Sequence, residues 1–187
     1  MSPISLKPSM SILRNTTDSD SVAVAVSLGS NLPYLNRSPK EVVLAAIQSL
    51  RRISIESQAS SLYLSEPIGC APGAENFVNA AMVLRLDSKA SAGKFLAVLQ
   101  GIEADYGRQR SAEQNQPRTL DLDIISYGSQ ELESPGLILP HPRATQRRFV
   151  LMPLAEILPE MVLPGQSASI AQLLAALPCI ENVQLLM

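Results

Sequence analysis

The chain has 187 residues, of which 46% are hydrophobic and 17% are charged. This balance is typical of one globular domain with a buried core, and it argues against a disordered chain. A formal net charge of −2 excludes a general attraction to polyanions, so long nucleic acid is not an expected partner. No apolar run approaches the roughly 20 residues that span a bilayer, so we expect no membrane partner either.

The first 20 residues are polar, with scattered Ser, Thr and Pro. They lack the continuous apolar segment of a secretory signal, and Asp18 and Asp20 are atypical of a transit peptide. We therefore predict a flexible tail over 1–20 and a single domain over 21–187. Cys70 and Cys179 form no CxxC pattern, which favours two free thiols in a reducing compartment. We expect a cytoplasmic monomer.

Hydrophobic periodicity predicts strands and helices that alternate along most of the domain. Their order is that of the split βαβ unit, so we predict a ferredoxin-like α+β sandwich with an antiparallel sheet and helices on one face. The predicted strands cover 21–31, 53–65, 77–87 and 118–128. The predicted helices cover 38–52, 89–107, 148–158 and 168–178, and loops are expected over 66–76 and 108–117.

The stretch QPRTLDLDIISYG (116–128) places two carboxylates in a predicted strand. Side chains alternate between the faces of a strand, so Asp121 and Asp123 project from the same face. Paired carboxylates suit Mg²⁺, which prefers oxygen ligands, although a solvated pair on an exposed face is the alternative for so short a motif. Three nearby arginines could surround a phosphate bound to such a metal, and they therefore favour the metal-site interpretation: Arg108, Arg110 and Arg118.

The stretch LPHPRATQRRFVLMPLAEI (139–157) holds the chain's one histidine, His141, between two prolines. A histidine held in this way can donate to a phosphate near neutral pH, although a structural or merely exposed histidine is the common alternative. Arg147 and Arg148 stand where a helix is predicted to begin, an end that prefers anions. A bound anion would relieve this conflict.

A third candidate lies on the predicted strand over 77–87. Phe77 and Asn79 project from one face of this strand, and Val78 and Ala80 project from the other. A Phe and an Asn side by side can stack on a flat heterocycle and read its amide edge. A core phenylalanine and a capping asparagine are an equally good interpretation of this segment alone.

Four stretches occur in one order: SLGSN (27–31), SEPIG…ENFVNAA (65–81), GR…QPRTLDLDI (107–124) and LPHPR…RRFVLMPLAEI (139–157). Together they resemble the 6-hydroxymethyl-7,8-dihydropterin pyrophosphokinases, and the resemblance covers about 21–164. It implies a ferredoxin-like α+β fold. It also implies an enzyme of folate biosynthesis that transfers diphosphate from ATP to the hydroxymethyl group of the pterin and releases AMP.

The resemblance also implies a role for each matched residue. Asp121 and Asp123 would hold two Mg²⁺ that bridge the triphosphate of ATP, the co-substrate. The residues implied in catalysis are these two aspartates with Arg108, Arg118 and Arg147. The pterin would contact Ser65, Ile68, Phe77, Asn79 and Phe149. ATP would contact Gln100, Glu103, Arg110, Arg118, Ile124 and His141, and no residue stands out as a general base.

One departure from the family pattern lies in the arginine-rich loop. Many members carry Arg-Trp and a small residue before the metal strand, whereas this chain carries Gln114, Asn115 and Gln116. Two other classes stay open. A metal-dependent phosphodiesterase or nuclease also uses paired carboxylates, but here only one histidine and no third adjacent acid accompany them. A non-catalytic module of the same family, which binds a pterin or nucleotide, is the other.

Overall fold

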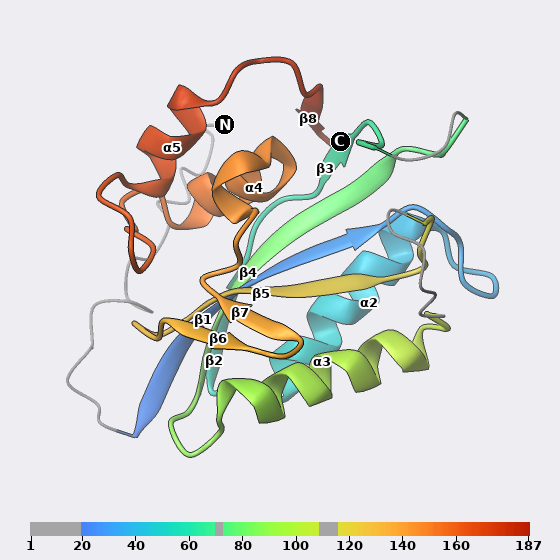
Figure 1. The fold of residues 1–187 in the computed structure, drawn as a ribbon. Helices are drawn as coiled ribbons and strands as arrows, with labels where there is room; N and C mark the ends of the chain where they lie inside the picture. The colour runs from blue at the N-terminus through green and yellow to red at the C-terminus, as the bar shows by residue number, and fades with distance from the viewer. Residues whose placement is uncertain (1–19, 70–72, 109–115) are drawn as a thin grey trace, which may run out of the picture.

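The computed structural model describes residues 20–69, 73–108 and 116–187, and it contains a six-stranded antiparallel sheet (Figure 1). The sheet order is β5-β1-β4-β3-β8, and β2 also pairs with β4. These strands are β1 (Ser21–Ser30), β2 (Glu56–Ala59), β3 (Tyr63–Ser65), β4 (Phe77–Asp87), β5 (Asp121–Tyr127) and β8 (Val183–Leu185). The α+β architecture predicted from the sequence is confirmed.

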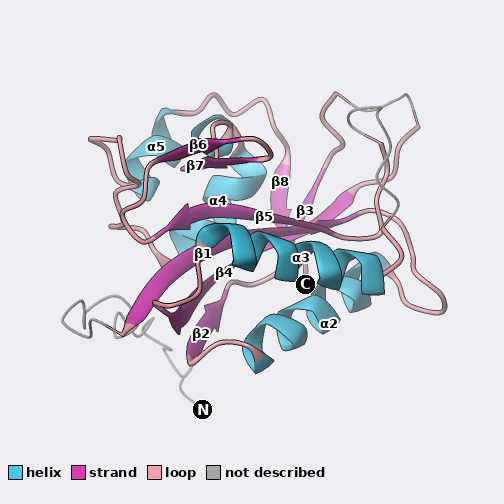
Figure 2. Cartoon of the chain, turned by 60° about the horizontal axis from the view of Figure 1, so that its bottom comes forward, coloured by secondary structure: helices cyan, strands magenta, loops and turns pink. Residues whose placement is uncertain are grey.

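Helices cover both faces of the sheet (Figures 1 and 2). The helices α2 (Pro39–Arg52) and α3 (Ala92–Asp105) pack on one face, and α4 (Arg148–Ile157) and α5 (Ile170–Ala176) pack on the other. The prediction of helices on one face only is therefore wrong. The reason is that Ala25, Ala81 and Val83 point away from α2 and α3, and they form a second buried cluster with α4.

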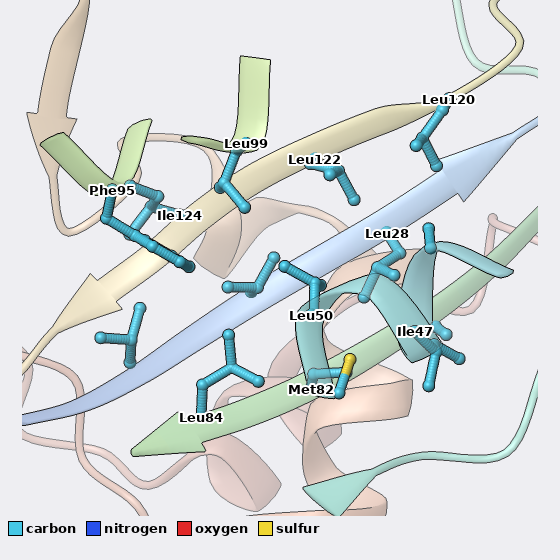
Figure 3. Packing of buried hydrophobic residues seen from close by; sticks show 14 of the residues in the cluster. Leu28, Ile47, Leu50, Met82, Leu84, Phe95, Leu99, Leu120, Leu122 and Ile124 are labelled. Carbon is cyan, nitrogen blue, oxygen red and sulfur yellow. The ribbon is translucent and has the colours of Figure 1, made fainter. Parts of the chain in front are cut away.

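The larger core lies between the sheet and the helices α2 and α3 (Figure 3). Alternate residues of each central strand point into it, and in β5 these are Leu122 and Ile124, followed by Tyr127 beyond a shift in register with β1. Ser38 begins α2 with a capping box, because its hydroxyl accepts from the Glu41 N–H while the Glu41 carboxylate accepts from the Ser38 N–H. Because the even-numbered residues at the start of β5 point into this core, the odd-numbered residues there face the α4 side.

The strand predicted over 53–65 is divided into β2 and β3. Both segments pair with β4, and the break falls at Ser60. The Ser60 N–H donates to the Ala81 carbonyl (2.8 Å), whereas the Ala81 N–H donates to the Ser60 hydroxyl (2.9 Å) instead of a carbonyl. A side chain thus replaces one bond of the ladder, and periodicity alone does not reveal this.

Three short strands were not predicted. They are β8 and a separate two-stranded hairpin of β6 (Leu132–Ser134) and β7 (Leu137–Leu139). Each has three residues, which is too few for an alternating pattern to be recognised. In the described ranges no helix has the length and apolarity needed to cross a membrane. The predicted tail lies outside the described residues except for Asp20.

We expect Ser60→Ala to lower the free energy of unfolding by about 1–3 kcal/mol, because it leaves the buried Ala81 N–H without an acceptor. Urea unfolding followed by circular dichroism measures this change. Ser57→Ala, in β2, is the matched control and should stay within about 0.5 kcal/mol of wild type. Equal stabilities of the two variants would contradict the role given to the Ser60 hydroxyl.

Candidate active site

Strand register places the two candidate patches beside each other. Gly29 in β1 is the register partner of Asn79 in β4 and of Asp121 in β5. A Cβ atom added at Gly29 would lie 3.5 Å from Asn79 Oδ1, 3.9 Å from Phe77 Cδ1 and 4.0 Å from Asp121 Cβ. The predicted heterocycle-binding pair and the predicted metal pair therefore form one continuous surface on the α4 side of the sheet.

Asp121 is neutralised by two arginines. Its carboxylate accepts from Arg108 Nη1 and from Arg118 Nη1, the latter at 2.6 Å. Burial would raise the pKa of Asp121, but the charges of Arg118 and Arg108 outweigh burial and hold this pKa below its usual value. Asp121 is therefore ionised in the structure.

The pKa of Asp123 is shifted in the opposite direction to that of Asp121. Burial, followed by the negative charge of Asp121, raises the pKa of Asp123 to about 6. Among the described residues no hydrogen bond or ion pair reaches the Asp123 carboxylate, although the charge of Arg147 is near enough to lower its pKa in part. The negative charge of Asp123 is thus less fully compensated by nearby arginines than that of Asp121.

This donor set fits Mg²⁺. Two carboxylates project from one strand face, and the described residues contain no cluster of three His, Cys, Asp or Glu side chains that could hold a metal ion. Mg²⁺ commonly takes one or two carboxylates and completes its shell with water and phosphate oxygens. Asp121 and Asp123 suit an ion of this kind better than one that needs a complete protein cage.

The end of β1 and Asn31, directly after it, brace the site, a role that was not predicted from the sequence. The Asn31 Oδ1 accepts from the Arg118 N–H (2.8 Å), and Asn31 Nδ2 donates to the Glu75 carbonyl (3.2 Å). The Ser30 hydroxyl donates to the Thr119 carbonyl (2.6 Å). Polar residues at the end of a buried strand were the available signal. These bonds tie the segments that lead into β4 and β5 to the end of β1.

Two residues assigned to ATP by the resemblance have buried side chains. Glu103 is 1% exposed, and its carboxylate pairs with Arg108 and accepts from the Leu122 N–H (2.9 Å). Ile124 packs in the larger core (Figure 3) and is 3% exposed, so a nucleotide could contact it only through its main chain. Gln100, in contrast, is exposed on α3.

The start of α4 brings two more predicted residues to the site. Arg147 directly precedes α4, and its Cζ lies 5.5 Å from the centre of the Phe149 ring. On the other side, Arg118 Cζ lies 5.9 Å from the centre of the Phe77 ring. Each predicted stacking ring therefore makes a cation–π contact with an arginine that was predicted to act on phosphate.

The remaining residues predicted to contact the pterin lie on β3 and just after it. Asn79 Nδ2 donates to the Ser65 hydroxyl (2.9 Å) and to the Phe77 carbonyl (3.3 Å), which leaves its Oδ1 directed toward Gly29. Ile68 is 49% exposed in the loop after β3. An amide oxygen next to aromatic and aliphatic side chains can accept from an N–H at the edge of a flat ring.

His141 is positioned as a neutral donor. The main-chain N–H of His141 donates to the Ile125 carbonyl in β5 (2.9 Å). Its ring Nδ1 accepts from the main-chain N–H of Arg143 (3.2 Å), so the imidazole proton lies on Nε2. Burial, followed by the charges of Arg147 and Arg143, lowers the pKa of His141 to about 4. His141 can thus donate a hydrogen bond at neutral pH without carrying a charge. Arg110, Gln114 and Asn115 lie outside the described residues.

The fold and the site define an α+β domain in which an acidic pair, flanking arginines and an aromatic–amide patch share one sheet face. Residues 25–159 match the model of the 7,8-dihydro-6-hydroxymethylpterin-pyrophosphokinase family, HPPK, and the chain belongs to this family. Relatives named 2-amino-4-hydroxy-6-hydroxymethyldihydropteridine pyrophosphokinase agree. The protein from Pseudomonas aeruginosa is 40% identical over 158 residues, which cover 83% of this chain and 91% of that protein. The one from Synechocystis is 38% identical over 155 residues, which cover 82% and 75%.

Solved structures support the fold. The wild-type HPPK-DHPS of Plasmodium falciparum matches 87% of this chain with a TM-score of 0.64 and 12% sequence identity. This chain spans 42% of that solved chain. The likeness therefore confirms the ferredoxin-like HPPK architecture and extends to nothing else in the larger protein.

We expect NMR titration of His141 to give a pKa of about 4, below the usual 6.5, because burial and two arginine charges disfavour the imidazolium. The chain has one histidine, so its imidazole signals need no assignment. Since the unfolded state binds this proton more readily, the stability contributed here is complete above pH 6.5 and is lost as the pH falls toward 4. Arg147→Ala should raise the pKa, and a wild-type value at or above 6.5 would contradict the geometry.

Proposed function

We propose that this protein transfers the terminal diphosphate of ATP to the hydroxymethyl group of 6-hydroxymethyl-7,8-dihydropterin. The hydroxymethyl oxygen attacks the β-phosphorus, and the bond from this phosphorus to the oxygen that bridges it to the α-phosphorus breaks. AMP leaves with that oxygen, and the hydroxyl proton is released. The product is the pterin diphosphate, and the step belongs to folate biosynthesis.

One observation carries this proposal, namely that Gly29 is the register partner of both Asn79 and Asp121. Neighbouring strands lie about 4.8 Å apart, so Asn79 and Asp121 are separated by about 10 Å across β1. A heterocycle over β4 and a phosphate chain over β5 would meet above Gly29. This arrangement suits a reaction that joins an alcohol on a flat ring to a polyphosphate.

We propose that the pterin ring binds between Phe77 and Phe149. The Asn79 Oδ1 would accept from an N–H of the ring edge, while Ser65 holds the Asn79 amide and Ile68 covers the ring. The Arg118 and Arg147 guanidinium groups lie near these rings, so an incoming ring would displace them. Displacement would direct both guanidinium groups toward the phosphates.

Phosphate binding is proposed for Arg108, Arg110, Arg118, Arg147 and His141. Asp121 and Asp123 would hold two Mg²⁺. When bound, these ions would offset the charge of the triphosphate and make the β-phosphorus a better electrophile. Gln100 and the main chain of Ile124 are proposed to border the nucleotide, and Glu103 would act indirectly by holding Arg108. Fixed cations aimed at a phosphate supply positioning and charge neutralisation, which is most of what phosphoryl transfer requires.

We propose further that the domain over 21–187 acts as a monomer in the cytoplasm, where ATP is available. A nuclease does not explain why Phe77, Asn79 and Phe149 adjoin the acidic pair, and a module that only binds a pterin does not explain the acidic pair with its arginines. The proposed activity does explain this, because both substrates must meet on one surface.

We expect AMP to form from ATP and Mg²⁺ only when 6-hydroxymethyl-7,8-dihydropterin is present, and Asp123→Ala to lower kcat by about 100-fold or more. AMP measured by chromatography is the readout. Asp105→Ala removes an exposed acid at the end of α3 and should retain wild-type activity. AMP formed without pterin would indicate a hydrolase, whereas pterin bound by folded protein without AMP would indicate a binding module.

We expect Gly29→Ala to raise KM for the pterin by about tenfold or more while the fold is retained. The added methyl group meets its neighbours at 3.5–4.0 Å, so it fits the fold but fills the space between the two proposed substrate sites. Steady-state kinetics and a thermal melt measure the two effects. In the control Gly101→Ala the new methyl group meets nothing within 4 Å in α3, so KM should not change. An unchanged KM in Gly29→Ala would remove Gly29 from the proposed site.

A further inference from the structure

We propose that Glu181, near the C-terminus of the chain, is a positioning residue for the pterin side of this site. Its carboxylate caps the start of α4 and thereby fixes the direction of Arg147 and Phe149. The proposal rests on the proposed function, because it is through pterin binding that the effect is measured. No site residue was predicted after 164.

The first turn of α4 needs an external anion. The turn contains no acidic residue, and Arg147, at the N-cap position, makes no side-chain capping bond. The positive end of the helix dipole therefore coincides with two arginines. The Arg148 N–H donates to Glu181 Oε2 at 2.8 Å, which satisfies one of the free donors of the helix end and supplies the opposite charge.

Glu181 is itself held in place by the chain that follows it. Strand β8 begins two residues later and pairs with β3, with Val183 opposite Ser65 (Figure 1). Asn182 Nδ2 donates to Glu66 Oε1 at 3.3 Å, and the Leu186 N–H donates to the Leu62 carbonyl at 2.8 Å. The C-terminal segment thus contacts both walls of the proposed pterin site, β3 with its loop on one side and α4 on the other.

The remainder of α4 does not depend on this cap. Leu151 and Leu154 are buried in the second core cluster. Glu156, at the far end, accepts from the Ser61 N–H at 3.0 Å and from the Tyr63 hydroxyl at 2.9 Å. Loss of Glu181 should therefore leave the helix folded and loosen only its first turn, where Arg147 and Phe149 lie.

The test compares Glu181→Ala with Glu181→Gln, which keeps an acceptor oxygen, and with the exposed control Glu160→Ala. Calorimetry gives Kd for the pterin in the presence of a non-hydrolysable ATP analogue, and AMP formation is assayed in parallel. We expect Glu181→Ala to raise Kd and KM for the pterin about fivefold, the size of a typical N-cap loss, and to raise KM for ATP by less, because Arg147 is only one of several proposed phosphate contacts. Glu181→Gln should restore both pterin constants to within twofold, and Glu160→Ala should match wild type.

Pterin constants in Glu181→Ala that match wild type would overturn the proposal. So would an equal rise in the pterin and ATP constants, because a general loosening of the protein acts on both substrates. A wild-type protein that binds pterin but forms no AMP refutes the proposed function, and its Kd values still decide the role of Glu181. Backbone NMR checks the cap directly, since the Arg148 amide should exchange faster in Glu181→Ala and not in Glu160→Ala.

Discussion

The site depends on the cost of placing two carboxylates side by side on a partly buried strand face. Burial and mutual repulsion both disfavour the doubly ionised pair, so cations must be held beside it. Arg108 is fixed by Glu103 and by the Leu120 carbonyl (3.1 Å), and the Arg118 main chain is fixed by Asn31. Much of the polar structure around β5 thus serves to compensate one carboxylate.

The compensation is unequal, and this inequality has a chemical meaning. Asp121 accepts from two guanidinium groups, whereas the pKa of Asp123 is raised to about 6. Asp121 and Asp123 would hold a divalent cation, which would supply positive charge on the Asp123 side. Arg108, which Glu103 also holds, and Arg118 lie beside the same carboxylate pair. Guanidinium groups pair well with phosphate oxygens, so a phosphate chain bound here would meet planar donors that are already in place.

Alternation along strands could be predicted from the sequence, and it gave the essential geometry. Asp121 and Asp123 do project from the same face of β5. Phe77 and Asn79 do project from one face of β4, and Val78 projects from the other. Contacts distant in sequence could not be predicted. Arg147 and Arg148 already indicated that the start of α4 needs an anion. That anion is Glu181, which accepts from the Arg148 N–H and lies 33 residues away along the chain. No local pattern indicates such a partner, and the same holds for the side chain of Ser60 that replaces a ladder bond.

Gly29 shows that a glycine can occupy a strand within the sheet for a functional rather than a conformational reason. Glycine is unfavourable inside a strand, and Gly29 does not adopt the positive φ that would require it. What distinguishes this position is that any side chain would stand between Asn79 and Asp121. A side chain here would therefore separate the two halves of the surface on which an alcohol and a polyphosphate must come into contact. Without a Cβ atom at Gly29, the surface between Asn79 and Asp121 stays open for the two proposed substrates.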